Sequence, residues 1–465
     1  MVQLGIPLQR YGGTNIGHVL VLTNSQLVSG GHNVAKRVVV IGGGIAGIQA
    51  SLDLADMGYQ VHLVEKTPSI GGKMAQLDKT FPTNDCSMCI LSPKMIMCAG
   101  HENVKLHTYS EIDRVEGDFP HFKVSIREKA RRVNVDRCTG CGDCVVKCPV
   151  KIPNEFEENI SSRKAIYLPF PQAVPRKMTI DGEHCRMVTS GKCRVCKKVC
   201  QAGAIEYDQK DKIVHLDASA VVVATGFDLA DVTILKQYGL GTCKDVITSL
   251  QLERILSASG PTGGRLVRFS DGKEPKKLAF IQCVGSRDER MYKYCSSVCC
   301  MYATKESILA REHIPDISST IFYMDMRATG KGFQEFVQRA EKNYGVRYVR
   351  SRPANVQPAN GEAGVLVTYE TRGLAGEQVT EEFDMLVLCP ALVPSQGAPK
   401  LAKLLGMELD EDGFLRASSL RHPGDSSRKG ILVCGFAGAP MDIPDSVTQA
   451  SGVAARVAEL LEGGA

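Results

Sequence analysis

The stretch Val38-Val39-Val40-Ile41-Gly42-Gly43-Gly44-Ile45-Ala46-Gly47 decides the fold of this 465-residue chain. Its four consecutive β-branched residues predict a buried parallel strand, and residues 48–57 predict the helix that follows. The pattern Gly42-x-Gly44-x-x-Gly47 between them is typical of a dinucleotide-binding turn. The first glycine permits the tight turn, the second lets the backbone approach a pyrophosphate, and the third lets helix and strand pack closely.

The residues after this turn strengthen the prediction of a dinucleotide site. Glu65 follows the next predicted strand, residues 60–64, at the place where an acid binds ribose hydroxyls. Gly71-Gly72-Lys73 follows Glu65, and Ala224-Thr225-Gly226 follows another buried strand. In flavoproteins with two dinucleotide domains such segments accompany FAD, so we predict FAD here rather than NAD. The residues predicted to bind it are Gly42, Gly43, Gly44, Ala46, Gly47, Glu65, Lys66, Gly72, Lys73, Thr225, Gly226, Gly435 and Ile443.

Eight of the 18 cysteines lie in two runs that interrupt this dinucleotide domain. The first run, Cys138–Pro149, is C-x2-C-x2-C-x3-C-P, the spacing of a bacterial ferredoxin. The second run has seven residues after its first cysteine and Gln201 where proline is usual. In such pairs the fourth ligand crosses to the other [4Fe–4S] cluster, whereas a zinc ribbon is the alternative. The predicted ligand sets are Cys138, Cys141 and Cys144 with Cys200, and Cys185, Cys193 and Cys196 with Cys148.

A third group of cysteines follows the predicted strand at residues 278–282. A second dinucleotide domain should carry its own glycine fingerprint there, but the chain has Cys283-Val-Gly-Ser-Arg-Asp288 instead. Cys295-x3-Cys299-Cys300 comes next. Four thiolates in place of a phosphate cradle predict a third [4Fe–4S] cluster where a nicotinamide would bind. Buried cysteines or a redox dithiol are the alternatives.

The remaining cysteines have no spacing that points to one kind of site. Cys86-x2-Cys89 follows the predicted flavin turn and fits a redox dithiol near the flavin ring, a partial cluster site with Cys98, or cysteines without a redox role. All three interpretations stay open on sequence alone. Isolated cysteines in apolar segments are expected to be packing residues. These are Cys243, Cys389 and Cys434.

Composition excludes several classes of protein. The chain is 43% apolar and 23% charged, and its net charge of +5 is dispersed, which argues against nucleic-acid binding. No apolar run reaches the roughly 18 residues of a membrane span, and the N-terminus lacks a signal-peptide pattern. Paired C-x2-C runs in a large chain indicate metal sites rather than disulfides. We therefore expect a cytoplasmic protein of an anaerobe.

Several segments together resemble the A-type component of heterodisulfide reductase, over the chain from about Arg37 to its end. They are Phe81-Pro-Thr-Asn-Asp-Cys-Ser-Met-Cys89, Cys138–Pro149, Tyr167–Pro175, Cys283–Asp288, Tyr294–Cys300 and Asp442–Val447. The resemblance implies a thioredoxin-reductase-like α/β flavoprotein with an inserted two-cluster ferredoxin domain, and a cluster on the third cysteine group. It also implies flavin-based electron bifurcation with B- and C-type subunits and an electron-donating module, and leaves a homodimer open.

The resemblance also assigns residues and domains. By position, Lys305 resembles a lysine that contacts the flavin ring, and Glu253 resembles an acid near it. The expected domains are a lead-in with one strand (1–36), the FAD domain in three parts (37–135, 208–277 and 401–465), the ferredoxin insert (136–207) and a degenerate NAD(P)-type domain (278–400). Compared with the long form, an N-terminal cluster domain and a C-terminal ferredoxin domain are expected to be absent. The choice between bifurcation and simple relay therefore stays open.

Two other functions compete with this one. A stand-alone NAD(P)H oxidoreductase similar to the small subunit of glutamate synthase would need a second glycine fingerprint, which the Cys283 segment lacks. A non-catalytic iron–sulfur scaffold would not need the intact flavin fingerprint at Gly42–Gly47. Both observations favour the electron-transferring flavin subunit.

Overall fold

The computed structural model describes residues 36–359, 363–371 and 376–463. The predicted N-terminal lead-in and its strand lie outside the described residues, apart from residue 36. The described chain forms one compact unit that contains two parallel sheets, and each sheet draws strands from distant parts of the sequence. This interleaving brings the predicted site residues together.

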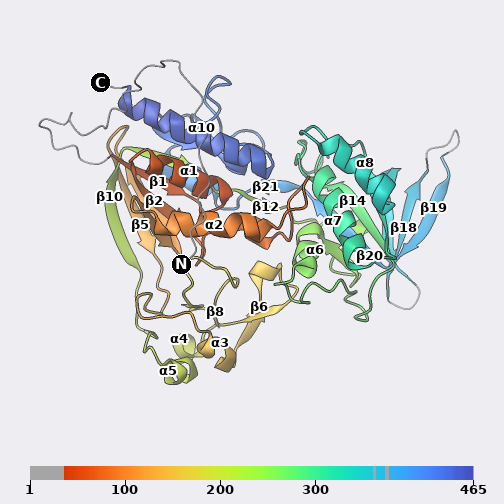
Figure 1. Cartoon of the computed structure of the whole chain (residues 1–465), viewed down its shortest axis with the longest axis horizontal. Helices are drawn as coiled ribbons and strands as arrows, with labels where there is room; N and C mark the ends of the chain where they lie inside the picture. Colours follow the sequence, from red (N-terminus) through yellow and green to blue (C-terminus); the bar gives the residue numbers. More distant parts are fainter. Residues whose placement is uncertain (1–35, 360–362, 372–375, 464–465) are drawn as a thin grey trace, which may run out of the picture. The chain divides into compact units, whose positions relative to one another are not determined.

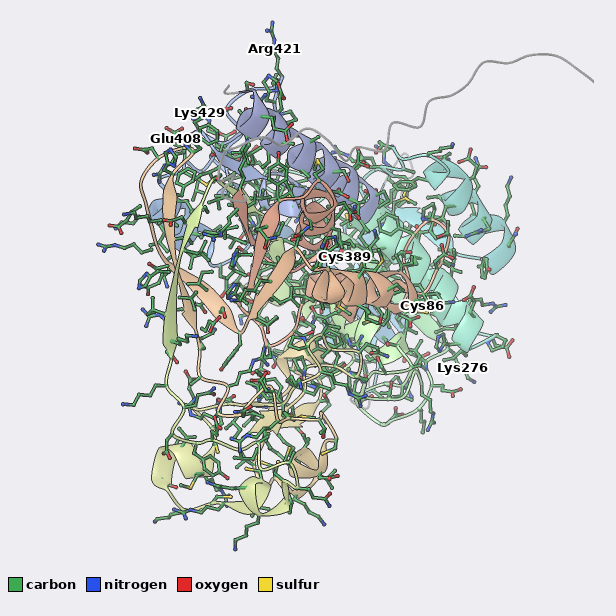
Figure 2. All side chains as sticks on the ribbon, turned by 60° about the vertical axis from the view of Figure 1, so that its left-hand side comes forward. Cys86, Lys276, Cys389, Glu408, Arg421 and Lys429 are labelled. Carbon is green, nitrogen blue, oxygen red and sulfur yellow. A yellow bond between two sulfur atoms is a disulfide. The ribbon has the colours of Figure 1, made fainter. Side chains whose placement is uncertain are left out.

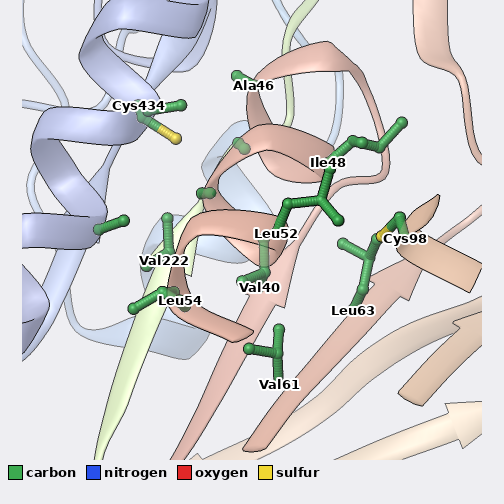
Figure 3. Close-up of a cluster of buried hydrophobic side chains, with 14 of the residues drawn as sticks. Val40, Ala46, Ile48, Leu52, Leu54, Val61, Leu63, Cys98, Val222 and Cys434 are labelled. Atoms are coloured by element: carbon green, nitrogen blue, oxygen red, sulfur yellow. The ribbon is translucent and has the colours of Figure 1, made fainter. Parts of the chain in front are cut away.

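The first sheet has five parallel strands with the dinucleotide turn at the end of its central strand. Their spatial order is β22 (Ile431–Val433), β11 (Ala220–Val223), β1 (Arg37–Ile41), β2 (Gln60–Glu65) and β3 (Val104–Thr108). Helix α1 (Ile45–Asp56) packs against α10 (Ile443–Glu462), and the two helices lie side by side in Figure 1. Apolar side chains of β1, β2 and β11 meet those of α1 in the core shown in Figure 3. The predicted strands and helices of this region are confirmed.

A three-stranded antiparallel sheet follows, with the order β10 (Lys212–Ala218), β5 (Phe122–Glu128) and β4 (Ser110–Glu116). Two of its strands lie within residues 100–135, where apolar and polar residues alternate, as at Phe122, Val124 and Ile126. The preceding strand β3 differs, because it extends the parallel sheet instead. Strand β10 returns to β5 only after the cysteine-rich insert, so both ends of the insert are anchored on the same sheet.

The second sheet is also parallel, in the order β13 (Val246–Thr248), β20 (Met385–Pro390), β14 (Lys277–Val284), β15 (Ser318–Tyr323) and β16 (Arg347–Arg350). Helices α6 (Ser249–Leu256) and α7 (Cys299–His313) pack against strands of this sheet, and α8 (Phe333–Tyr344) packs against α7. The sheet thus takes a strand from before residue 278, where sequence analysis begins the second domain. The main-chain pairing of β13 with β20 joins residues far apart in the chain, and local sequence patterns do not predict it.

Smaller elements complete the second half of the chain. Strand β12 (Phe227–Leu229) pairs with β21 (Leu392–Pro394), and α9 (Ala398–Leu405) comes next. An antiparallel meander is formed by β17 (Asn355–Pro358), β18 (Val365–Glu370) and β19 (Gln378–Phe383). None of the described helices is both long enough and apolar enough to cross a bilayer.

The cysteine-rich insert is built from short elements. It contains α3 (Asp143–Lys147), α4 (Arg186–Ser190) and α5 (Val195–Val199), and the hairpins β6–β7 (Lys151–Pro153, Ser162–Lys164) and β8–β9 (Ile166–Tyr167, Thr179–Ile180). The Pro-rich stretch between Cys148 and Cys185, with Pro153, Pro169, Pro171 and Pro175, has the composition of a loop but contains both hairpins. Its prolines fall at the end of β6 or between β8 and β9, where no ladder hydrogen bond is lost.

Candidate functional site

The glycine turn between β1 and α1 leaves room for a ligand. A Cβ on Gly47 would lie 1.8 Å from the Gly42 carbonyl oxygen, and one on Gly42 would lie 2.3 Å from the Ala224 carbonyl oxygen. A Cβ on Gly44 would meet nothing within 4 Å. Gly44 is the N-cap of α1 and supplies no capping side chain, so the first N–H groups of the helix remain available to an anion. Gly42 and Gly47 therefore serve packing, whereas Gly44 faces open space.

Polar groups converge on the same turn. Buried Glu65 accepts hydrogen bonds from the N–H groups of Gly43 (2.7 Å) and Thr67 (2.8 Å). The Thr225 hydroxyl oxygen is buried and has no hydrogen-bond partner among the described residues. A buried hydroxyl without a partner, beside an uncapped helix N-terminus, fits the polar groups of a bound dinucleotide.

The other predicted flavin residues lie in the loop after β22, at the start of α10, in η1 and in the segments after β2 and β11. Gly435 has φ +66°, and a Cβ on it would lie 2.9 Å from the Ala46 Cβ, so the loop after β22 touches the start of α1. Ile443 begins α10. Gly72 begins the short 3-10 helix η1 (Gly72–Gln76), Gly226 adopts φ +64°, and Lys66 is exposed. The Lys73 ammonium lies 3.3 Å from a carboxylate oxygen of Glu158, which belongs to the insert.

A buried ion pair joins the flavin half of the molecule to the second sheet. Lys305 on α7 and Glu253 on α6 are 1% and 2% exposed, and the Lys305 ammonium donates to the Glu253 carboxylate. The same ammonium donates to the Lys79 carbonyl oxygen at 2.8 Å, and Glu253 accepts from the Asp78 N–H at 2.9 Å. Residues 78 and 79 follow η1, so α6, α7 and the segment after the flavin turn meet at one point.

Glu306, the next residue on α7, is a site residue that sequence analysis missed. Its side chain is buried, and one of its carboxylate oxygens has no hydrogen-bond partner among the described residues. Burial first, and then the neighbouring charge of Glu253, raise the pKa of Glu306 well above its ordinary value. The signal available in the sequence was the surrounding run Met301–Ala310, in which Lys305 and Glu306 are the only charged residues.

A second buried ion pair joins the ferredoxin insert to α6. The Arg254 guanidinium donates to Glu157 of the insert at 3.0 Å and to the Gln76 carbonyl oxygen at 2.9 Å. The Gln76 amide in turn donates to the Phe156 carbonyl oxygen at 2.8 Å. Gln76 is the last residue of η1. Arg254 of α6 therefore links the second half of the chain to both the insert and η1. Such a buried pair orients the segments it joins more than it stabilises the fold.

The structure brings the eight cysteines of the insert close together. A single cavity is lined by the second predicted ligand set, namely Cys148, Cys185, Cys193 and Cys196. Thiols of both sets lie near Cys144. Burial raises its pKa to about 12, and so do the thiols of Cys196 from the second set and of Cys138, Cys141 and Cys200 from the first. Within the described residues, no three His, Cys, Asp or Glu side chains are close enough to hold a single metal ion. Four thiols around a cavity are a ligand set that both a [4Fe–4S] cluster and a zinc ion use.

The third cysteine group lies where β14 ends and α7 begins. Cys283 occupies a bulge of β14 with φ +56°, and its sulfur lies 3.9 Å from that of Cys299, the first residue of α7. The Cys300 sulfur accepts the Arg327 N–H at 3.4 Å. Cys283, Cys299 and Cys300 are buried, whereas Cys295 is half-buried. The fold thus brings together residues that are up to 17 positions apart.

The electrostatics favour the thiolate form at two of these cysteines. A hydrogen bond with Cys299 lowers the pKa of Cys283, and lowers that of Cys300 to about 7. The same two hydrogen bonds, and then burial, raise the pKa of Cys299 well above its ordinary value. Arg287, which pairs with Asp325, lies near Cys283 and Cys295. Thiolates are the form of cysteine that binds metals. Arg287 was missed as a candidate, although it belongs to the quoted Cys283–Asp288 segment.

Cys86 and Cys89 are joined by a disulfide at the start of α2 (Ser87–Gly100). Figure 2 labels Cys86. Cys98 lies further along the same helix, buried in the apolar core, and burial raises its pKa to about 12. Cys243, Cys389 and Cys434 are buried in apolar surroundings, as expected for packing residues.

Comparisons with known proteins agree with this geometry. Residues 37–85 match the profile of FAD dependent oxidoreductases, and residues 131–153 match the 4Fe-4S binding domain. The chain therefore combines an FAD site with iron–sulfur ligands. The structure is similar to that of Lactococcus lactis thioredoxin reductase, with a TM-score of 0.50 and 14% identity over 92% of this chain and 99% of the other. This confirms the predicted thioredoxin-reductase-like α/β fold.

The chain is also similar in sequence to named proteins. Three of them are described below, and each is an A-type component of a heterodisulfide reductase or a protein similar to one. The chain is 47% identical to that of the H2:CoB-CoM heterodisulfide, ferredoxin reductase of Methanothermobacter thermautotrophicus, over 92% of this chain and 64% of the relative. It is 50% identical to the second iron-sulfur A-type component of the CoB–CoM heterodisulfide reductase of Methanopyrus kandleri, over 93% and 65%. It is 41% identical to the A-like heterodisulfide reductase protein of Archaeoglobus profundus, over 93% and 67%. The chain thus spans about two thirds of the length of these relatives.

Proposed function

Since the chain belongs to the family of A-type heterodisulfide reductase components, we propose that it is the electron-transferring flavin subunit of a heterodisulfide-reductase-like oxidoreductase complex. The observation that supports this most is that α6 and α7 connect the separate parts of the site. Arg254 of α6 binds Glu157 of the insert and Gln76 of η1, and Lys305 of α7 binds the Lys79 carbonyl oxygen. Cys299 and Cys300 of the third cysteine group begin α7. When bound, FAD would supply the chemistry that links electron pairs to single electrons. The chain's own residues bind it, fix its surroundings and hold the clusters nearby.

Lys305 and Glu253 are proposed to set the electrostatics at the flavin ring. The Lys305 side chain is buried next to residues 78–79, which follow η1, and it donates to the Lys79 carbonyl oxygen. A buried cation there would stabilise negative charge on the adjacent ring system. Glu253 neutralises Lys305 in the absence of that charge and fixes its position. The pair therefore supports either bifurcation or relay, both of which require control of the flavin's potential.

The twelve cysteines of the three groups are proposed as ligands of three [4Fe–4S] clusters. Two clusters would use the crossed sets of the insert, and the third would use Cys283, Cys295, Cys299 and Cys300. Arg254 holds the insert against the flavin turn through Glu157 and Gln76, which gives a structural basis for electron flow between insert and flavin. The stand-alone NAD(P)H reductase is not favoured, because β14 carries a bulge at Cys283 and the segment after it has Gly285 but no G-x-G-x-x-G pattern.

The partners are part of the proposal. B- and C-type subunits, an electron-donating module and a second copy of this chain are the expected neighbours, and the reducing cytoplasm of an anaerobe is the expected compartment. The names of the relatives as subunits of reductases support this. Tagged protein isolated anaerobically from native cells should retain B- and C-type subunits. Recovery of the chain as a free monomer with full activity toward NADH would contradict the proposal.

The cofactor content provides the direct test. Anaerobically purified chain should hold one FAD and about twelve iron atoms, four for each cluster. The double variant Cys299→Ala/Cys300→Ala should lose about four iron atoms and keep its flavin. Cys243→Ala is the matched control, since Cys243 is buried but isolated, and it should keep all the iron. Unchanged iron in the double variant would remove the third cluster from the proposal.

A further inference from the structure

The disulfide at the start of α2 has no part in the function proposed above. Cys86 and Cys89 are bonded to each other, with their Cα atoms 5.2 Å apart, so neither is available as a cluster ligand in this state. We propose that this pair is a second redox centre, which exchanges two electrons with an external thiol or disulfide compound. The proposal concerns the surface of α2 and does not depend on how the flavin or the clusters work.

The two sulfur atoms have different surroundings. Cys89 is exposed, whereas Cys86 is half-buried at the N-cap of the 14-residue helix α2. The Cys86 sulfur accepts a hydrogen bond from the Cys89 N–H at 3.2 Å. A helix N-terminus and an N–H donor both stabilise a thiolate. Cys89 is thus the accessible sulfur, and Cys86 is the sulfur that leaves most easily as a thiolate.

This asymmetry defines a balanced exchange. An external thiolate attacks the Cys89 sulfur, forms a mixed disulfide with it, and releases Cys86 as a thiolate. A second external thiolate then attacks the external sulfur of that mixed disulfide and releases Cys89. Two electrons and two protons pass to the cysteine pair, and the external dithiol becomes a disulfide. The reverse sequence, begun by the Cys89 thiolate, reduces an external disulfide.

The surface beside Cys89 indicates the kind of compound that can approach. Along the same exposed side of α2 lie uncharged residues at helical spacing, and three of them are large and apolar: Ile90 (39% exposed), Ile96 (61%) and Met97 (61%). Pro93 between them is also exposed. A sulfur compound with an uncharged carrier fits this surface better than a multiply charged one. Its source, a small dithiol or a protein dithiol, is distinguished by the test.

The segment before the disulfide leads directly to the buried ion pair. Cys86 forms a β-bridge with Lys79, and the Ser87 N–H donates to the Asp78 carbonyl oxygen at 3.0 Å. Residues 78 and 79 are the two that contact Glu253 and Lys305. The redox centre is therefore connected through one short segment to the residues proposed to set the flavin's potential.

The first test measures the state of the pair in the full-length holoprotein under anaerobic conditions. The protein is equilibrated with mixtures of dihydrolipoamide and lipoamide, alkylated with iodoacetamide, and digested. The peptide with both cysteines should change from unlabelled to doubly labelled in one two-electron step. A peptide that is doubly labelled at every ratio, or unlabelled in a large excess of dithiol, would overturn the proposal. Faster reduction by reduced thioredoxin than by dihydrolipoamide would support a protein source, and the reverse order a small one.

The second test assigns the two sulfurs with an uncharged linear disulfide, bis(2-hydroxyethyl) disulfide. Reduced Cys86→Ser protein should accumulate a mixed disulfide at Cys89, because the resolving thiol is absent. Reduced Cys89→Ser protein should form an adduct at least about tenfold more slowly, because Cys86 is less accessible. Cys98→Ser, in the buried face of the same helix, is the matched control and should behave as wild type. Equal adduct rates in the first two variants, or loss of iron from either, would overturn the proposal.

Discussion

At the scale of single residues, the buried carboxyl group of Glu306 governs how this site responds to pH. Its raised pKa means that the folded chain keeps a proton that the unfolded chain releases above about pH 4.5. The free energy of unfolding therefore falls as pH rises from that value toward the folded pKa, by up to about 1.4 kcal/mol per pH unit. Below the unfolded value both states are protonated, and this contribution vanishes.

We expect Glu306→Gln to remove this contribution because glutamine does not titrate. Urea unfolding at a series of pH values should show a shallower loss of stability for the variant than for wild type between about pH 5 and pH 8. Glu312→Gln lies on the same helix but at an exposed position, and it should keep the wild-type slope. Parallel slopes for Glu306→Gln and wild type would show that Glu306 ionises normally in the folded chain.

The Lys305–Glu253 pair makes a different prediction at the same scale. Lys305→Met leaves the Glu253 carboxylate buried without its cation, which should lower the free energy of unfolding by about 3–5 kcal/mol. The double variant Lys305→Met/Glu253→Gln should recover much of that loss, because no uncompensated charge remains. A double-mutant cycle from denaturant unfolding measures this coupling. Additive effects of the two substitutions would mean that the pair does not interact in the folded chain.

At the scale of elements, the turn between β1 and α1 separates the roles of its glycines. Gly44→Ala meets no neighbour within 4 Å and should leave the fold intact, yet its methyl group would lie where a pyrophosphate approaches. We expect purified Gly44→Ala to lose most of its flavin while it keeps its iron, and to unfold at the same midpoint as wild-type protein from which the flavin has been removed. Absorbance after acid release, with an iron assay on the same sample, measures this.

A matched glycine on another helix controls for the substitution itself. Gly452 lies in α10, is exposed, and would also accept a Cβ without a contact within 4 Å. Gly452→Ala should keep the flavin and increase the free energy of unfolding by about 0.5–1 kcal/mol. Full flavin content in Gly44→Ala would place the dinucleotide elsewhere.

At the scale of the whole molecule, the second sheet repeats the parallel arrangement of the first but has Cys283 near the end of its central strand. A nicotinamide dinucleotide needs free N–H groups at a glycine turn and a helix N-terminus. Strand β14 instead leads into the bulge at Cys283, and α7 begins at Cys299 and Cys300. The anaerobic holoprotein alone should therefore not oxidise NADH or NADPH at an enzymatic rate. Stopped-flow mixing would contradict this if the flavin bleached rapidly and the rate saturated with NADH.

The sequence by itself determined those features whose chemistry is local. The strand–turn–helix at Gly42–Gly47 and the ferredoxin spacing at Cys138–Pro149 each place their functional groups within a few residues. Only the tertiary structure decided which distant groups meet. It paired Arg254 with Glu157, 97 positions away, placed Glu306 beside Glu253, and added β13 to the second sheet. Local spacing encodes turns and ligand loops, whereas contacts across tens of residues depend on how whole sheets and helices pack.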